Sequence, residues 1–229
     1  WDPAFAYELA TIIQFGIKEM VEDDKDVIHY IAVYNENYPM PPKPKSVDEG
    51  IIKGLYMLRG APKGDGPMVR LIGSGPIMLQ VLDAVEKLEE FGVRSEIWSA
   101  TSYGELRRDG LEVDRWNLMH PEKAARQTWV ETQLGNSKTP IIAVSDNMAA
   151  VPDMIRKWMP ENYEVLGTDG FGRSDTREAL RRFFEIDGVA VTLAALSQLV
   201  RKGDIDAKVY QKAVKKFGVS SERTDITEL

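Results

Sequence analysis

The stretch "MVRLIGSGPIMLQVLDAVEKLEEFGVRSEIWS", residues 68–99, sets the fold class of this 229-residue chain. An apolar run over 68–73 is followed by an amphipathic pattern over 76–92 and by a second apolar run over 94–99. Short apolar runs predict buried strands, and apolar residues spaced three and four apart predict a helix. The helical pattern has a proline in its first turn and a glycine at its end, the usual asymmetry of helix boundaries. A strand, a helix and a strand in this order predict a parallel sheet covered by helices.

The same alternation continues towards the C-terminus. Apolar runs over 140–146 and 163–168 predict two more strands. The polar stretch 103–121 is assigned no regular element. Helical patterns are expected over residues 122–134, 152–159, 175–185, 188–201 and 205–217. We therefore expect residues 68–229 to form an α/β domain with a mostly parallel sheet.

The N-terminal part has a different character. Residues 5–22 place apolar side chains at helical spacing, and residues 27–34, "VIHYIAVY", are rich enough in β-branched and aromatic residues to predict a strand. Four prolines between positions 39 and 44 interrupt both patterns. We interpret residues 1–34 as the closing helix and strand of a preceding α/β domain, and residues 35–67 as an interdomain arm.

Composition excludes several classes of function. The chain has no cysteine, which removes thiol catalysis, thiolate metal sites and disulfides, and which fits a reducing compartment. The formal charge of −7 argues against nucleic acid or an anionic membrane as the main partner. The most apolar stretch, "GVAVTLAALSQLV", is too short to cross a bilayer and predicts a buried helix. The two histidines, His29 and His120, lie far apart in the sequence and are expected to be structural.

The turn "IGSGPIM" lies where a dinucleotide-binding loop would lie, between a strand and a helix. The G-x-G-x-x-G fingerprint needs Gly73, Gly75 and a third glycine, but Met78 stands at that third position. A tight strand-to-helix turn is therefore favoured over a dinucleotide site. The helix N-terminus behind Ser74 and Gly75 can still attract an anion weakly.

A second turn, "GTDGFGRSDTRE" at residues 167–178, follows the last predicted strand. Ser174 or Asp175 is expected to cap the next helix, and Glu178 stands at the capping-box position relative to Asp175. The stretch contains no nucleophile and no set of metal ligands, so its own chemistry does not indicate a reaction centre.

The acidic and basic residues of this turn leave two interpretations open. They form either an Asp–Arg network that fixes the loop, which is favoured, or an anion site at the carboxyl end of a parallel strand. The candidate anion niche comprises Ser74, Gly75, Asp169, Arg173, Ser174 and Arg177.

Five motifs in order along the chain resemble one family. They are "YNENYPMP" (34–41), "GIIKGLYML" (50–58), "LIGSGPI" (71–77), "RDGLEVDRWNLMHP" (108–121) and "VLGTDGFGRSDTREALRRFFEID" (165–187). Together they resemble the C-terminal part of the homodimeric, bacterial-type pyruvate dehydrogenase, the decarboxylating first component of the pyruvate dehydrogenase complex. The resemblance extends over essentially the whole chain.

The resemblance implies a transketolase-like architecture of three domains, with the chain ending in a transketolase C-terminal-like domain. It implies a homodimer that holds thiamine diphosphate and Mg²⁺ between its subunits. The full enzyme is expected to decarboxylate pyruvate, to acetylate the lipoyl group of the dihydrolipoyl acetyltransferase component, and to be cytoplasmic. The cofactor carries the carbanion chemistry and the protein positions it.

The same resemblance places the cofactor-binding and catalytic residues upstream of Trp1. Gly64, Asp65 and Gly66 imitate the start of the diphosphate–metal motif, but no asparagine follows at the required spacing, because none occurs between Asn37 and Asn117. We therefore assign no catalytic, cofactor-binding or metal-binding residue, and expect no cofactor to be bound by this chain alone. The predicted role is structural and dimer-supporting, without activity in isolation.

Two other functions are kept as alternatives. One is a non-catalytic anion-binding or assembly module that uses the candidate niche. The other is a free-standing dehydrogenase with a degenerate glycine loop, which predicts stabilisation by NAD.

Overall fold

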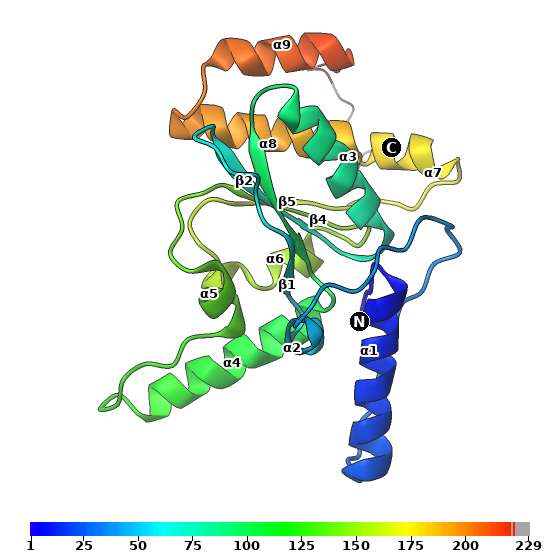
Figure 1. Cartoon of the computed structure of the whole chain (residues 1–229), viewed down its shortest axis with the longest axis vertical. Coiled ribbons are helices and arrows are strands. Elements are labelled where there is room, and N and C mark those ends of the chain that lie inside the picture. The colour runs from blue at the N-terminus through cyan, green and yellow to red at the C-terminus, as the bar shows by residue number, and fades with distance from the viewer. Residues whose placement is uncertain (221, 223–229) are drawn as a thin grey trace.

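The computed structural model describes residues 1–220 and 222, so the predicted end of the 68–229 domain, residues 221 and 223–229, lies outside the described residues. Within the described residues five strands form one sheet in the order β1-β3-β2-β4-β5 (Figure 1). The strands are β1 (Tyr56–Arg59), β2 (Met68–Gly73), β3 (Arg94–Ser99), β4 (Ile141–Val144) and β5 (Tyr163–Leu166). The α-helices are α1 (Ala6–Ile17), α2 (Asp48–Lys53), α3 (Met78–Glu89), α4 (Tyr103–Met119), α5 (Trp129–Leu134), α6 (Ala150–Asp153), α7 (Arg177–Phe183), α8 (Gly188–Lys202) and α9 (Ala207–Phe217).

The predicted strand–helix–strand unit is confirmed as β2, α3 and β3. β2 runs parallel to both β3 and β4, and β4 runs parallel to β5. β3 lies on one side of β2, and the chain then crosses over to place β4 on the other side. This reversal of strand order creates a switch point between β2 and β4, the place where open α/β sheets usually bind ligands.

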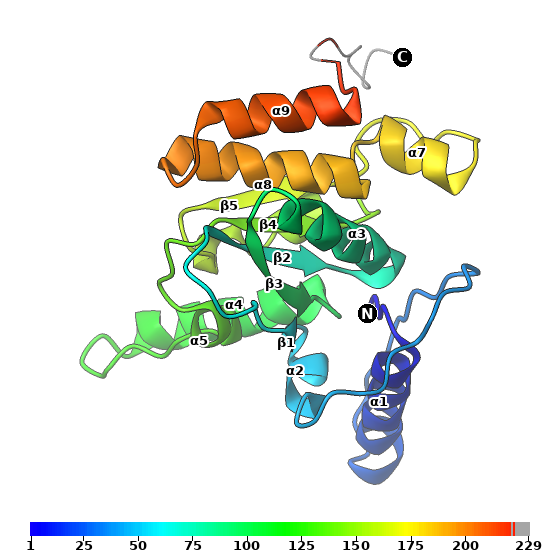
Figure 2. The ribbon, with the colours of Figure 1, turned by 45° about the horizontal axis from the view of Figure 1, so that its top comes forward.

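Helices cover both faces of the sheet, as Figure 2 shows: α3, α8 and α9 lie over one face, with α4 and α5 on the other. Alternating side chains of one strand point to opposite faces. Leu71 packs in the cluster that contains α3 and α8, whereas its neighbour Ile72 packs in the cluster that contains α4 and α5. Both layers of the core therefore depend on the same short strands.

Residues Arg177–Lys202 are long and apolar enough, by length and composition alone, to cross a membrane. In the fold they form two helices, α7 and α8, and Glu185 between them has a positive φ of 56°. α8 packs against α3 and β4. Its place in the core accounts for its apolar sequence, and the predicted buried helix is confirmed.

Three predictions for residues 103–159 of the sheet domain are wrong. The polar stretch 103–121 contains the 17-residue helix α4, which buries only a narrow stripe and whose Gly110 lies against the Trp158 ring. The helix predicted over 122–134 is limited to α5, because Thr128 caps it and forms a capping box with Glu131. The helix predicted over 152–159 is replaced by α6 and a 3₁₀ turn, Arg156–Trp158.

The N-terminal helix is confirmed, but the strand after it is not. α1 continues through a π-helical turn, Lys18–Glu22, to the end of the predicted range. Residues 27–34 carry no strand assignment, and Ile28 and Tyr30 are 94% and 81% exposed. A strand needs a hydrogen-bonded neighbour, and none of the described strands lies beside this segment.

The arm predicted over 35–67 contains elements of the sheet domain. α2 leads into β1, which pairs antiparallel with β3 and so forms an edge of the sheet. Gly54 makes this connection possible: its φ is 97°, and a Cβ there would lie 2.4 Å from the Ser102 carbonyl oxygen. Residues 35–47, which contain the prolines, and residues 60–67 carry no helix or strand.

Candidate functional site at the carboxyl edge of the sheet

Two buried serines lie at the base of the switch point. Ser74 follows β2 and Ser145 follows β4, and neither is exposed to solvent. The Ser74 hydroxyl donates to the Ser145 hydroxyl at 3.1 Å. Ser145 Oγ also accepts hydrogen bonds from the backbone and side-chain nitrogens of Asn147. The crevice between β2 and β4 is therefore polar and internally bonded.

Asp2 covers this crevice. Its amide donates to the Thr101 carbonyl at 2.8 Å, and its own carbonyl accepts from the Gly75 amide at 3.0 Å. Gly75 has a φ of 50°, and a Cβ there would lie 2.5 Å from Asp2 Oδ1. The turn that was predicted to attract an anion is thus occupied by a carboxylate of the same chain.

A second acid and a tyrosine complete the cluster. Asn147 Nδ2 donates to Asp2 Oδ2 at 3.4 Å, and the Tyr34 hydroxyl donates to Asp146 Oδ1 at 3.3 Å. Burial, with a further contribution from the Asp146 charge, raises the pKa of Asp2 to about 6. Burial likewise raises the pKa of Asp146 above its ordinary value. The two carboxyl groups are thus held where ionising both is unfavourable.

Residues 34–38 form a strap that runs beside this cluster. Arg177 donates to the Asn35 side chain, and Arg181 makes a two-pronged pair with Glu36. The side chains of Arg181 and Glu36 are only 13% and 18% exposed, so this ion pair is partly shielded from solvent. The Tyr38 hydroxyl donates to the carbonyl of Ala4. The strap therefore ties α7 to the first residues of the chain.

The loop 167–178 is held by contacts that differ from the predicted ones. Asp169 accepts a hydrogen bond from the Ala149 amide at 3.0 Å, and Arg173 stacks over the Phe183 ring. The predicted cap is wrong: Thr176, rather than Ser174 or Asp175, caps α7 by accepting from the Ala179 amide. Asp175 instead accepts from the Thr176 amide at 2.7 Å.

The six residues of the candidate niche therefore lie in different surroundings. Ser74 and Gly75 meet Asp2, Arg177 meets the strap, and Asp169 and Arg173 fix their own loop. Ser174 is exposed within that loop. The two arginines of the niche, Arg173 and Arg177, contact different partners and do not converge on one binding site. Anion binding by the niche residues stays a prediction.

Sequence reasoning missed Glu8, which is fully buried in α1. Its carboxylate accepts from the Ala4 and Phe5 amides at 2.5 and 3.0 Å. From the sheet it accepts from the Tyr56 hydroxyl at 2.5 Å and the Ser99 hydroxyl at 2.7 Å. The sequence signal is an acid inside the apolar stripe of residues 5–22, three positions after Phe5 and four before Ile12.

Burial raises the pKa of Glu8, although its four hydrogen bonds oppose that shift. The Tyr56 hydroxyl also bonds to the Tyr7 hydroxyl at 2.6 Å, and burial raises the pKa of Tyr7 to about 12. The residues of this network come from α1, β1 and β3. It joins the N-terminal helix to the sheet rather than opening onto a cavity.

Two cavities are described by their lining residues. One, about 750 Å³, lies between α4 and α5; its lining includes Asp114, Asn117, Arg126, Thr128, Glu131 and Trp158. The other, about 340 Å³, lies beside the strap and is lined by Glu36, Gln80, Arg177, Glu178, Arg181 and Asp187. Both arginines of this second cavity lie within ion-pair distance of Glu36.

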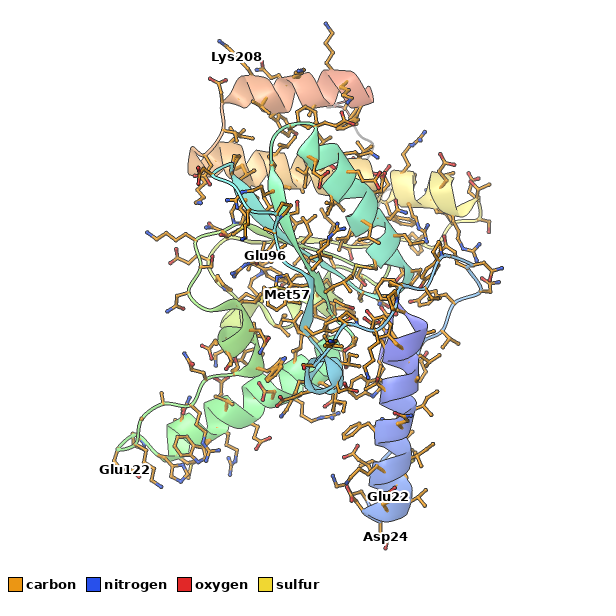
Figure 3. All side chains as sticks on the ribbon, viewed as in Figure 1. Glu22, Asp24, Met57, Glu96, Glu122 and Lys208 are labelled. Carbon is orange, nitrogen blue, oxygen red and sulfur yellow. The ribbon has the colours of Figure 1, made fainter. Side chains whose placement is uncertain are left out.

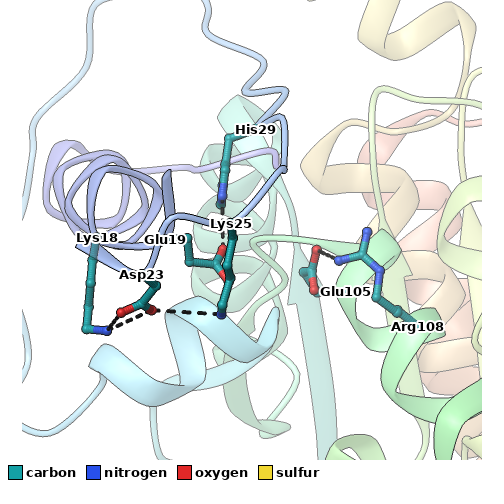
Figure 4. Close-up of polar contacts among 7 residues, drawn as sticks. All are labelled: Lys18, Glu19, Asp23, Lys25, His29, Glu105 and Arg108. Carbon is teal, nitrogen blue, oxygen red and sulfur yellow. Dashed lines mark hydrogen bonds and ion pairs between the residues drawn. The ribbon is translucent and has the colours of Figure 1, made fainter. Parts of the chain in front are cut away.

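Both histidines are held by local contacts. His29 Nε2 lies 3.1 Å from Glu19 Oε2 (Figure 4). The His29 ring also stacks on Trp1. His120 Nδ1 lies 2.9 Å from the Trp116 carbonyl oxygen, and its ring stacks on the Trp116 indole. These partners agree with a structural role for each ring.

The residues present do not fit a diphosphate-bound metal. Asp65 is exposed in the loop before β2, at the opposite edge of the sheet from the switch point, and Arg94 binds the carbonyl of Gly66. Within the described residues no three His, Asp or Glu side chains are grouped to hold a metal ion. The region covering Gly75 is likewise filled by Asp2, which leaves no room there for a dinucleotide.

The sheet order and the two helical layers allow the fold to be compared with solved structures. The fold resembles solved transketolases: an R525L mutant from Pichia stipitis aligns with a TM-score of 0.56 at 17% identity, over 87% of this chain and 25% of that one. A second Pichia stipitis transketolase, in complex with sedoheptulose-7-phosphate, aligns with the same score over 90% of this chain and 26% of that one. The class is that of transketolase-like α/β domains.

The sequence comparisons are more specific. The family model described as the transketolase-like TK C-terminal domain matches residues 54–187, and the model of the pyruvate dehydrogenase E1 component middle domain matches residues 1–41. The chain belongs to the transketolase-like C-terminal domain family.

Relatives named pyruvate dehydrogenase E1 component align with nearly the whole chain. The protein of Pseudomonas aeruginosa is 48% identical over 97% of this chain and 26% of its own length. That of Escherichia coli K12 is 41% identical over 98% of this chain and 25% of its own length. The chain thus spans about a quarter of the length of these curated relatives.

Proposed function

We propose that this chain is the C-terminal portion of a pyruvate dehydrogenase of the homodimeric, acetyl-transferring type. The proposal rests on the alignment of nearly the entire chain with E1 components at 41–48% identity. The match of residues 1–41 to the model of the E1 middle domain supports it. The complete enzyme decarboxylates pyruvate and acetylates the lipoyl group of its dihydrolipoyl acetyltransferase partner. It works as a homodimer in the cytoplasm.

Thiamine diphosphate with Mg²⁺ supplies the carbanion chemistry when bound to the complete enzyme. The residues of this chain do not hold that group, and their role is to support it from a distance. Glu8 and Asp2 fix the end of the middle domain on the sheet of the C-terminal domain. The strap 34–38 adds the Glu36–Arg181 pair to the same junction. The portion is thereby structural and inactive by itself.

The proposal is tested by assaying pyruvate decarboxylation with thiamine diphosphate and Mg²⁺. The 229-residue chain alone is expected to give no turnover, and the longest gene product that carries this sequence is expected to be active. In that gene product, Glu8→Ala is expected to lower activity together with thermal stability, because the residue acts through the junction. Turnover by the 229-residue chain alone, or an inactive full-length product, contradicts the proposal.

A further inference from the structure

The switch-point cluster joins two parts of the chain that match different family models. Asp2 and Tyr34 lie within residues 1–41, which match the middle domain, whereas Asp146 lies within residues 54–187, which match the C-terminal domain. The Tyr34 hydroxyl bonds to Asp146, and Asp2 is bonded through its backbone to Thr101 and Gly75. Any movement of the N-terminal segment relative to the sheet must break these contacts.

The cluster contains more negative charge than donors to satisfy it. Asp2 Oδ1 is buried without a hydrogen-bond partner among the described residues, and Oδ2 accepts a long bond of 3.4 Å from Asn147. Each carboxylate alone can be tolerated in such a site, but two ionised carboxylates around one tyrosine hydroxyl repel one another. Protonating one acid removes the repulsion and supplies the missing donor.

We propose that Asp2, Tyr34 and Asp146 form an acid-closed latch that holds residues 1–38 on the carboxyl edge of the sheet. The latch is closed when at least one of the two carboxyl groups carries a proton, and it loosens when both are ionised. It gives the junction between the two domains a dependence on pH that the Glu36–Arg181 pair beside it does not share, since an arginine stays charged throughout.

The groups facing the cluster set the range over which the latch responds. Arg181 of α7 favours an ionised Asp146, whereas Glu36 of the strap disfavours its ionisation. Tyr103 of α4 and Tyr34 stay protonated, because burial raises the pKa of both hydroxyls. Asp2, whose pKa is raised to about 6, is therefore the carboxyl group whose ionisation sets the response, and the pKa of Asp146 is raised in the same direction by burial.

The direction in which latch closing depends on pH follows from the raised pKa of Asp2. A carboxyl group whose pKa is higher in the closed state binds its proton more tightly there, so closing is favoured at low pH. This advantage is complete below the ordinary pKa of an aspartic acid and is lost as the pH rises through about 6. The latch is accordingly closed in acid and weakened above neutrality.

Hydrogen–deuterium exchange tests the latch in the longest gene product that carries the sequence. The reporters are the amides of Asp2, Ala32 and Gly75, whose bonds to Thr101, Trp1 and Asp2 hold the segment in place. Asp146→Asn keeps an acceptor for Tyr34 and removes the charge. At pH 7.5 this variant is expected to protect the reporter amides roughly tenfold more than wild type, the effect of one pKa unit.

The comparison is repeated at pH 5, where wild type and variant are expected to converge because the wild-type cluster is then protonated. Asp2→Asn provides a second charge removal and is expected to act in the same direction. Glu122→Gln removes an acid at the far tip of the loop after α4 and serves as the matched control (Figure 3). Equal exchange in wild type and both cluster variants at pH 7.5 overturns the latch, as does a difference that persists unchanged at pH 5.

Discussion

The first 34 residues and the sheet domain differ in which side chains they bury. The N-terminal segment (residues 1–34) buries the carboxylate of Glu8 completely and exposes Val21, Ile28 and Tyr30 by 74%, 94% and 81%. In the sheet domain, strands β2 and β4 bury their central apolar residues completely. The sheet domain is thus stabilised mainly by apolar burial, whereas the segment adds the polar contacts of Glu8 to a smaller apolar contact made by Phe5 and Ile12.

Figure 3 makes the contrast visible at the end of α1. Glu22 and Asp24 lie at the far tip of the N-terminal segment, away from the sheet. This tip is organised by exposed ion pairs, such as Lys18–Asp23 and Lys25–Glu19, which Figure 4 shows. The difference teaches that the segment contributes its strongest contacts through a few residues near its start.

Glu8→Ala is expected to have the largest effect, because it leaves two amides and the Ser99 hydroxyl buried without an acceptor and leaves the Tyr56 hydroxyl with only its Tyr7 partner. The loss in unfolding free energy should be about 3 to 5 kcal/mol, the cost of breaking a buried charged network. Urea unfolding measures it, with Glu22→Ala at the exposed tip as the control. A loss no greater than that of the control would show that the segment is held by apolar contacts instead.

Gly110→Ala tests the sheet domain by overpacking it. A Cβ at this position lies 2.5 Å from the Trp158 ring, and we expect a loss of about 2 kcal/mol. Gly104→Ala in the same helix is the matched control, because its Cβ meets only Ser102 Oγ at 3.7 Å. Thermal unfolding separates the two variants. Equal melting temperatures would mean that α4 does not pack tightly on the core.

Lys18→Ala is expected to have the smallest effect. Its ion pair with Asp23 lies at the exposed tip, and exposed pairs contribute little because solvent and salt screen them. The urea midpoint should match that of wild type within error, at both low and high salt. A clear, salt-dependent loss would show that the tip itself stabilises the segment.

The periodic parts of the fold could be predicted from the sequence. The run 68–99 predicted β2, α3 and β3 because each element carries its own pattern of apolar residues. α4 could not be predicted in this way, since it buries little beyond Tyr103, Leu106 and Gly110. The strand expected over 27–34 has the right composition but no neighbouring strand among the described residues.

The site was less predictable because its contacts join distant residues. The turn at Ser74 and Gly75 was correctly predicted to connect a strand to a helix, and its attraction for anions stays a prediction. That Asp2, more than 70 positions earlier, covers this turn depends on the path of the whole N-terminal segment. Glu8 could have been noticed as an acid in an apolar stripe, but its partners on β1 and β3 could not.

The antiparallel strand β1 has a practical consequence for where this molecule can be divided. Because β1 shields β3 from solvent at the sheet edge, removing everything ahead of Met68 would uncover a row of unpaired backbone groups. A shortened gene for the sheet domain should therefore begin upstream of Asp48, so that α2 and β1 are retained. Truncation at the proline-rich stretch keeps the edge closed and should favour a monodisperse product over an aggregating one.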